Sequence, residues 1–340
     1  MSPTVIPNDS QKTFLRRFSK LTCLATLFLI FAGGMVTSTG SGLSVPDWPL
    51  SYGLIFPPMV GGVFYEHGHR MVATLVGLLT LCLAVSLAVW EPRPWVKVLG
   101  FCAFGAVVLQ GVLGGITVLF FLPAPVSVSH AVLAQTFFVL TIIIAYAQSL
   151  DRHARRGTES ARIDWKITKG SLFLFILVYL QLILGAIMRH THSGLAIPDF
   201  PTMGGYWLPP FNDLMLAKIN QVRLDLNWQF NLQLAPVTIW QVLIHFLHRL
   251  FALFIIFVVL ILNMRGSKTP EPKLKRTLFL VNLVLLLQAA LGIMTILSLK
   301  SPVITSLHVV TGGAMLGLSV LLVLRFSPLS WTEFRKVVLQ

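Results

Sequence analysis

Four of the nine histidines recur at nearly the same spacing in the two halves of the chain. His69 and His130 are 61 positions apart, and His248 and His308 are 60 apart. Each lies in or beside a long apolar run, where an ionisable side chain is costly and usually faces the interior of a helix bundle. Two neutral imidazoles are too few ligands for zinc, but they supply both axial ligands of a haem in a four-helix bundle. The spacing therefore favours two haem sites.

The residue one helical turn before the first histidine of each pair differs between the halves. It is Glu66 in the first half and His245 in the second. A carboxylate beside a haem ligand can accept protons or stabilise positive charge during substrate oxidation. Its alternative role is to cap the start of a helix. We expect His245 to be a hydrogen-bond partner behind the ligands, or an interfacial residue. The difference predicts chemistry in the first half and electron storage or transfer in the second.

An arginine directly follows the first histidine of each pair. Arg70 and Arg249 break the charge pattern of the chain at equivalent places. A haem carries two propionate groups, which a guanidinium group can bind with two parallel hydrogen bonds. The alternative is that each side chain extends to the membrane interface. We expect both arginines to bind propionates.

The elements that must hold these residues are membrane helices. The chain has 340 residues, of which 55% are hydrophobic and 11% charged, and its mean hydropathy is +0.80. This composition excludes a soluble globular enzyme and a disordered chain. Eight apolar runs are long enough to cross the hydrocarbon core, which predicts an all-α integral membrane protein with eight transmembrane helices. The runs are 21–39, 67–90, 97–119, 128–149, 170–189, 239–263, 277–297 and 304–325.

The charges give the orientation of these helices. The net charge is +14, and 20 of the 26 lysines and arginines fall on one side of the predicted membrane. That side is cytoplasmic by the positive-inside rule, so both termini are predicted inside and the histidine sites toward the outside. This bias explains the basic character without nucleic acid, which is not expected as a partner. The six exceptions are Arg70, Arg189, Lys218, Arg223, Arg249 and Lys300. The three cysteines fall inside the runs, so no exported disulfide is expected.

The chain also contains an internal duplication. Residues 41–49 (SGLSVPDWP) resemble residues 193–201 (SGLAIPDFP), and the histidines and nearby glycines follow the same register. The repeat predicts two pseudo-symmetric four-helix bundles related by an axis along the membrane normal. We expect an N-terminal bundle at 14–150 as the catalytic half, a cytoplasmic linker at 151–169, and a C-terminal bundle at 170–326 as the cofactor half. Residues 190–238 form a longer loop without a counterpart, which suggests a cover at the membrane surface or a docking site for a partner.

These residues resemble the heme A synthase family, the membrane enzymes that convert haem O to haem A for cytochrome oxidase. The resemblance extends from about Phe14 to Arg325. Its specific elements are the run from Gly33 to Pro49, the Glu66-x-x-His69-Arg70 motif, and the three later histidines. Many bacterial members carry a cysteine pair in an outer loop, which this sequence lacks.

The resemblance implies a role for each pair of histidines. His248 and His308 are expected to ligate a resident haem b, and His69 and His130 the substrate haem O, with Glu66 in catalysis. The implied reaction oxidises the porphyrin C8 methyl group to a formyl group through an alcohol and a gem-diol. Electrons would leave through the haem b to an acceptor that the sequence does not identify. Haem O synthase would deliver the substrate, and the absence of a long transit sequence favours a bacterial plasma membrane.

Two other functions remain open at this point. A di-haem electron-transfer protein, of the kind in which a cytochrome b oxidises quinol, would explain two histidine pairs but gives Glu66 no necessary role. A haem carrier or exporter would explain one labile haem but not a second fixed site. A homo-oligomer is also left open by the sequence.

Overall fold

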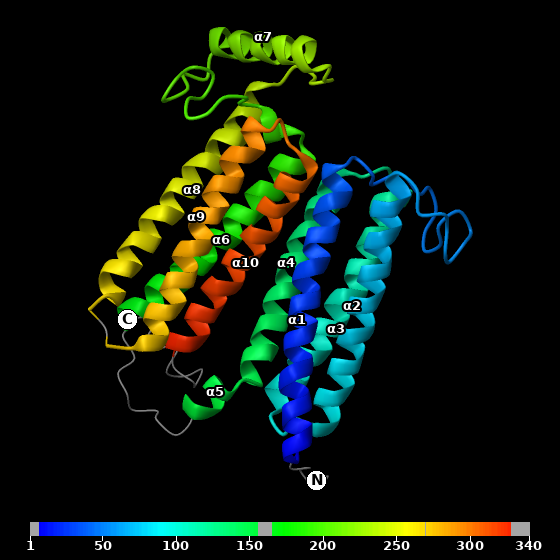
Figure 1. Cartoon of the computed structure of the whole chain (residues 1–340), viewed down its shortest axis with the longest axis vertical. Coiled ribbons are helices and arrows are strands. Elements are labelled where there is room, and N and C mark those ends of the chain that lie inside the picture. Colours follow the sequence, from blue (N-terminus) through cyan, green and yellow to red (C-terminus); the bar gives the residue numbers. More distant parts are fainter. Residues whose placement is uncertain (1–6, 156–164, 269, 328–340) are drawn as a thin grey trace.

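The computed structural model describes residues 7–155, 165–268 and 270–327. Within these ranges eight helices are long and apolar enough to cross a membrane, and each predicted run falls on one of them (Figure 1). The all-α membrane fold with eight spanning helices is therefore confirmed. The helices are α1 (Asp9–Ser38), α2 (Gly62–Trp90), α3 (Pro94–Leu119), α4 (Ala124–Ala147), α6 (Trp165–His190), α8 (Ile239–Gly266), α9 (Pro272–Leu297) and α10 (Pro302–Phe326).

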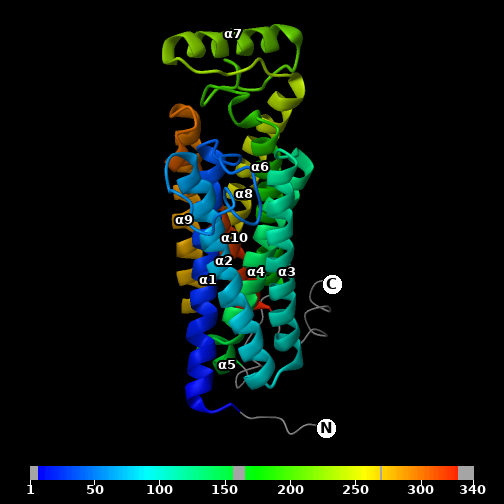
Figure 2. The ribbon, with the colours of Figure 1, turned by 90° about the vertical axis from the view of Figure 1, so that its right-hand side faces the viewer.

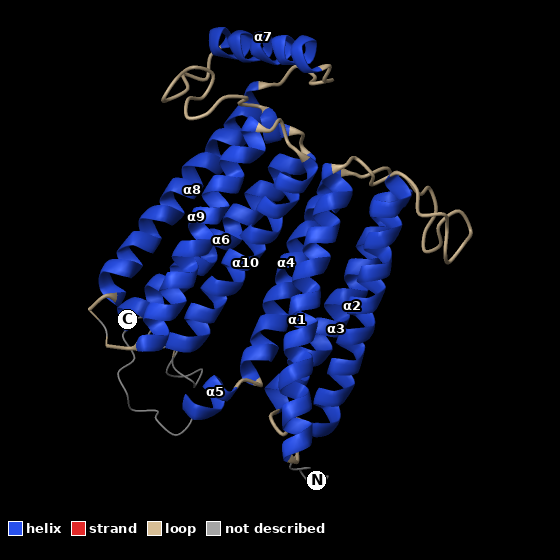
Figure 3. Ribbon diagram, in the orientation of Figure 1, coloured by secondary structure: helices blue, strands red, loops and turns tan. Residues whose placement is uncertain are grey.

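The remaining regular elements are short. They are α5 (Leu150–Arg155), the 3-10 turn η1 (Ser193–Leu195) and α7 (Asp213–Phe230), and no strand occurs in the described ranges (Figure 3). Part of the basic linker and the end of the C-terminal tail lie outside the described residues. Four basic residues that entered the orientation argument are among them: Arg156, Arg162, Arg335 and Lys336.

The spanning helices form two groups of four that lie side by side (Figure 1). The first group, α1 to α4, packs around a core that includes Val76, Leu83 and Phe137. The second group, α6 and α8 to α10, packs around a separate core that includes Leu174 and Leu316. Helices α1 and α4 contact α10 and α6 across the boundary. The symmetry axis between the groups, and the cytoplasmic position of the termini, stay predictions.

Helix α2 starts before its apolar run does. It begins at Gly62, so Glu66 lies beyond its first turn and His69 lies well inside it. Glu66 is therefore not the residue that caps the helix. The apolar run marks only the hydrocarbon core, and a helix can continue past it where its polar side chains find partners. Here those partners lie in the loop that precedes α2.

Helix α7 lies across one end of the second group, over the ends of the spanning helices (Figures 1 and 2). We call this end of the molecule the α7 end. Met215 and Ile219 of α7 are fully buried in a cluster with Ile197 and Val242. The sequence did not predict α7, because its charged residues make it too polar for a membrane span and its loop has no equivalent in the first half.

Two loops at the α7 end have the same local structure in both halves. Residues 41–54 follow α1 and residues 193–206 follow α6, and each loop closes with an isolated bridge between residues three apart. In each loop one aspartate accepts two backbone N–H groups. Asp47 accepts from Tyr52 and Gly53, and Asp199 accepts from Gly204 and Gly205. The duplicated sequence therefore folds in the same way twice.

The loop of the second half should depend on the charge of Asp199. Partial burial alone would raise the pKa of Asp199, but hydrogen bonds from Thr202, Gly205 and Gly204 lower it below its ordinary value. We expect Asp199→Asn to cost about 1 kcal/mol, since the half-buried carboxylate loses charge-assisted bonds. Thermal unfolding in detergent at pH 7 would measure the loss.

The pH dependence of that loss tests whether the charge of Asp199 is its cause. A lowered pKa means that the stabilising charge is present at neutral pH and is lost as the pH falls through the folded-state pKa. The difference between wild type and Asp199→Asn should therefore shrink in acid. A constant difference, or an equal effect of Asp225→Asn on the exposed side of α7, would contradict it.

Candidate functional site

The four predicted histidines meet in two pairs near the α7 end of the spanning helices. His69 of α2 and His130 of α4 occupy the equivalent positions in the first group, since each ring packs on a glycine of the preceding spanning helix. His248 of α8 and His308 of α10 have ring centroids 6.5 Å apart and an angle of 67° between their rings. The fold therefore brings together the residues that the spacing paired.

Each histidine ring packs against a glycine of a neighbouring helix. A Cβ atom placed on that glycine would lie within 3.5 Å of the ring, which is at or inside ordinary contact distance. The absence of a side chain therefore lets the ring lie against the helix backbone. The four pairs are Gly33 with His69 (3.0 Å), Gly114 with His130 (3.5 Å), Gly185 with His248 (3.2 Å) and Gly292 with His308 (3.0 Å).

These glycines were not predicted as site residues, although a signal for them exists. Gly114 and Gly292 stand four residues after Gln110 and Gln288 in the repeat, and Gly33 belongs to the motif that carries the family resemblance. The side-chain amide of Gln110 donates to the His130 carbonyl at 2.8 Å, and the amide nitrogen of Gln288 lies 3.5 Å from His308 Nε2. The repeat marked these positions, but only the packing shows what they contact.

The Nδ1 atom of each of the four imidazoles is buried and has no hydrogen-bond partner among the described residues. A buried polar atom without a partner is rare in proteins, and an ordinary core histidine would have one. In the second pair, the separation of the ring centroids would allow a metal ion to be held between the two imidazoles. No group of three or more histidine, cysteine, aspartate or glutamate side chains in the described ranges could hold a metal ion. Each pair could therefore hold the iron of a haem, for which two imidazoles would serve as ligands.

Glu66 and His245 connect the helices to the two equivalent loops. Glu66 is 4% exposed, and its carboxylate accepts from the Val45 N–H at 2.9 Å and from Arg70 at 2.7 Å. His245 is 3% exposed and accepts from the Ile197 N–H at 3.2 Å. Each side chain thus holds the same position of its loop. The difference is one of charge, because a carboxylate stands where the second half has an imidazole.

Arg70 and Arg249 also hold the loops. Arg70 donates to the carbonyl oxygens of Asp47 at 2.8 Å and Leu50 at 2.7 Å. Arg249 donates to the carbonyl oxygen of Asp199 at 2.8 Å and to further carbonyl groups of the same loop. These bonds give each guanidinium group a place in the loop that the sequence did not reveal. Propionate binding by the two arginines stays a prediction.

Trp48 connects the first loop to the helix that carries Gly114. Its indole ring lies over Gly115, where a Cβ would come within 2.7 Å of the ring. This contact places the loop beside the first histidine pair, since Gly114 is the neighbour of Gly115. The loop can therefore shield that pair from water.

Arg189 links the two groups of helices. Its guanidinium donates to the Gly34 carbonyl at 2.6 Å and to Ser38 Oγ at 2.8 Å, both on α1. Ser306 of α10 completes the contact, because its Oγ lies 3.1 Å from Ser38 Oγ. A Cβ placed on Gly34 would lie 3.3 Å from the Cβ of Ser306, and Gly34 directly follows the glycine that faces His69. The sequence marked Arg189 only as an exception to the charge bias.

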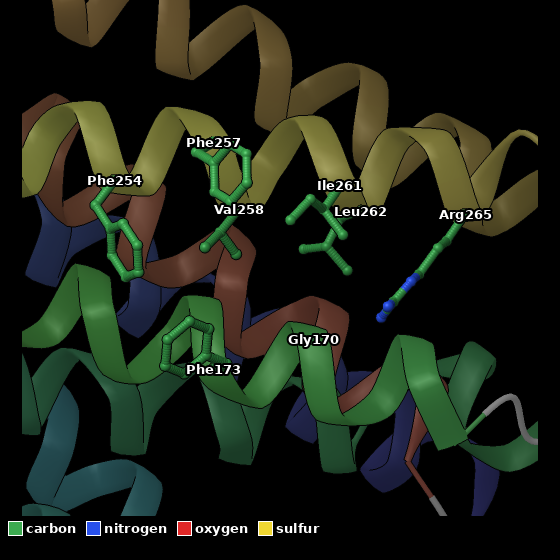
Figure 4. Close-up of a pocket in the computed structure, with 8 residues that line it drawn as sticks. All are labelled: Gly170, Phe173, Phe254, Phe257, Val258, Ile261, Leu262 and Arg265. Carbon is green, nitrogen blue, oxygen red and sulfur yellow. The ribbon is translucent and has the colours of Figure 1, made fainter.

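A separate apolar groove lies between α6 and α8 at the other end of the molecule (Figure 4). Phe173, Phe254 and Phe257 line it, together with Gly170 of α6 and one charged residue, Arg265. Gly170 is about 22 Å along α6 from Gly185, so the groove is distinct from the histidine pairs. Its apolar wall suits lipid chains and offers no ligand for a metal.

The glycine contacts lead to a test of the second pair. Gly292→Ala would place a Cβ 3.0 Å from the His308 ring and displace it. We expect about tenfold weaker haem binding or an altered absorption spectrum, because overpacking a core costs about 1–3 kcal/mol. Gly111→Ala is the matched control, since nothing lies within 4 Å of its new Cβ. Equal haem content and identical spectra in both variants would argue against the packing role.

Comparison with known proteins gives the family and the relatives that this chain resembles. The family model described as COX15-CtaA, cytochrome oxidase assembly protein, matches residues 16–322. The chain is 32% identical over 206 residues to a heme A synthase of Bacillus licheniformis, which covers 57% of this chain and 66% of that protein. It is 31% identical over 207 residues to the heme A synthase of Halalkalibacterium halodurans, covering 57% and 66%. With that of Lysinibacillus sphaericus it shares 26% over 239 residues, covering 67% and 72%. The chain thus spans just under two thirds of the length of the first two relatives.

Proposed function

The chain belongs to the COX15-CtaA family of cytochrome oxidase assembly proteins, and on this premise we propose that it oxidises haem O to haem A. The observation that carries the proposal is the presence of two histidine pairs whose Nδ1 atoms are buried without a partner, of which one alone has a carboxylate a helical turn away. Converting a methyl to a formyl group removes four electrons and four protons when water supplies the oxygen. Such a reaction needs a substrate site, a proton acceptor and a route for electrons.

The two pairs divide these tasks. His69 and His130 hold the substrate haem O in the first half. His248 and His308 hold a resident haem b in the second half, which supplies one-electron redox chemistry when bound. The glycines behind the rings set the orientation of all four imidazoles. The names of the relatives support a role in haem A biosynthesis, while the assignment of each haem to a pair is our proposal.

Glu66 is the residue that makes the first half the reacting half. It stands three residues before His69 on α2, so both side chains lie on one face of the helix. The Val45 N–H and Arg70 hold its carboxylate in place. There it can accept a proton from the substrate or stabilise positive charge that develops during oxidation. The loop that docks through Trp48 limits the access of water to this position.

A di-haem electron-transfer protein is the second candidate. It is favoured by the close likeness of the two sites, since both have a histidine pair, two facing glycines and an arginine clamped to the loop. In such a protein Glu66 would serve only to hold the loop, as His245 does. The candidates therefore differ in what happens when Glu66 loses its charge.

The proposal includes a setting for the reaction. We place the enzyme in a bacterial plasma membrane, with the histidine pairs toward the outer side. Haem O would be received from a haem O synthase, and the electrons would pass to an acceptor outside the chain. Whether the chain forms a homo-oligomer is measured in the same purified sample.

The first test identifies the bound haems. We expect protein purified from membranes that also make haem O to contain haem b together with haem O or an oxidised derivative. Chromatography and mass spectrometry of the extracted haems would measure them. His248→Ala should remove the haem b and its low-spin absorption signal, while His69→Ala should leave both. Haem b alone under every condition would count against haem O as the substrate.

The second test concerns Glu66. We expect Glu66→Gln to keep both haems but to lower haem A formation by about 100-fold or more, as loss of a general acid–base group does. Glu91→Gln is the matched control: Glu91 follows the same helix, is 2% exposed and pairs with Arg93 at 2.6 Å, far from the histidines. Unchanged haem A formation in Glu66→Gln would favour the electron-transfer candidate.

A further inference from the structure

We propose that Arg189 and Lys300 form a carboxylate-binding site at the α7 end of the second histidine pair, which takes the propionate groups of the haem held there. The inference rests on the resident haem of the proposed function. It assigns to Arg189 and Lys300 the task that the sequence had suggested for Arg70 and Arg249. It also distinguishes the two halves by how firmly each holds its haem.

Arg189 lies close to the second histidine pair along α6. Arg189 lies four residues after Gly185 on α6, and residues four apart share one face of a helix. Gly185 faces the His248 ring. Arg189 therefore lies one turn beyond that ring, in the direction of the α7 end. The groups of a haem that point toward the membrane surface would lie at this level.

The guanidinium group of Arg189 has hydrogen-bond partners but no ion-pair partner among the described residues. One terminal nitrogen donates to the Gly34 carbonyl and to Ser38 Oγ, which are both uncharged acceptors. None of the ion pairs found in residues 7–155, 165–268 and 270–327 involves Arg189. A guanidinium removed from water normally pairs with a carboxylate or phosphate. Arg189 thus has charge and donors to offer an anion.

Lys300 adds a second positive charge to the same place. It lies in the turn between α9 and α10, and its side chain passes within 4.0 Å of a Cβ placed on Gly194. Partial burial lowers the pKa of Lys300 below its ordinary value, and the positive charges of Arg189 and Arg223 lower it further. Arg223 is already bound to loop carbonyl groups, including that of Leu195. An anion between Arg189 and Lys300 would relieve the repulsion between them.

Ser38 and Ser306 tie this cluster to the second histidine of the pair. Arg189 donates to Ser38 Oγ, and Ser306 Oγ lies 3.1 Å from the same atom. Ser306 stands two residues before His308 on α10. The cluster is therefore connected to the helices of both ligands, through Gly185 to His248 and through Ser306 to His308.

The first half lacks this site. The duplication places Thr37 where the second half has Arg189, and Leu122 where it has Lys300. Both halves also have an arginine after the first histidine, Arg70 and Arg249. These two guanidinium groups donate hydrogen bonds to carbonyl oxygens of the loops. The duplication therefore supplies these two basic residues only in the second half, while the donors of Arg189 also reach α1 of the first half. This suits a cofactor that must stay, whereas a substrate must enter and leave.

The experiment compares haem b with haem b dimethyl ester, in which both propionates are uncharged. The full-length protein with His69→Ala, which loads only the second pair, is reconstituted with each compound, and the dissociation constants are measured by absorption. We expect haem b to bind about tenfold more tightly than the ester, as charge-assisted hydrogen bonds require. Arg189→Thr and Lys300→Leu, which install the first-half residues, should each reduce this preference while the two-histidine spectrum stays unchanged.

Two controls separate the site from general effects. Lys218→Met removes a positive charge from α7, where the amine lies over the Tyr206 ring, and should leave the preference intact. In a His248→Ala chain, which loads only the first pair, Lys300→Leu should change nothing. Lys300 lies in a turn and keeps part of its side chain in solvent, so its variant should fold even if Arg189→Thr does not.

The results that would overturn the propionate site differ from those that would overturn the proposed function. No preference for haem b in the wild-type site, or an undiminished preference in Lys300→Leu and Arg189→Thr, would overturn the propionate site. Failure to bind any haem would overturn both proposals. Haem binding with the expected preference, together with no haem A formation by the wild-type chain, would support the site and refute the enzyme.

Discussion

Each of the four paired histidines lies against a helical glycine, and in both halves this contact follows from the register of the sequence repeat. A ring that packs on a neighbouring backbone needs two helices close together and in one register. The pairing of Gly185 with His248 places α6 against α8, and the pairing of Gly292 with His308 places α9 against α10. The helix packing of the second group therefore also fixes where its two imidazoles face each other. The first group repeats the arrangement with its own glycines.

The loops at the α7 end complete the sites by satisfying polar groups that the membrane cannot. Glu66 and Arg70 lie near the end of the hydrocarbon core, where unpaired polar groups are costly. Backbone groups of the loop at 41–54 supply their partners, and the same positions of the loop at 193–206 serve His245 and Arg249. The two halves thus share one framework. The carboxylate of Glu66 changes the charge beside the first histidine pair without changing the contacts that hold the loop.

The contact between α1 and α10 brings the two sites into one molecule. On α1, Gly33 faces the ring of His69, and the next residue, Gly34, touches Ser306. Ser306 is two residues from His308. A short path of packed backbone therefore runs from the first pair to the second, with Arg189 bound across the same boundary. This arrangement suits a protein that oxidises a substrate in one half and carries electrons through the other.

The sequence by itself determined the eight spanning helices, the duplicated loops and the pairing of the four histidines. These follow from hydropathy and spacing, which are properties of neighbouring residues and of the repeat. Only the tertiary structure decided that Arg70 and Arg249 hold loop carbonyls, that Glu66 and His245 bind the same backbone position of their loops, and that α7 covers one end. Those outcomes depend on which backbone groups a fold brings to a side chain from distant parts of the chain. The glycines depend on both. The sequence repeat gave their positions, and only the packing of the histidine rings against them showed why glycine is needed there.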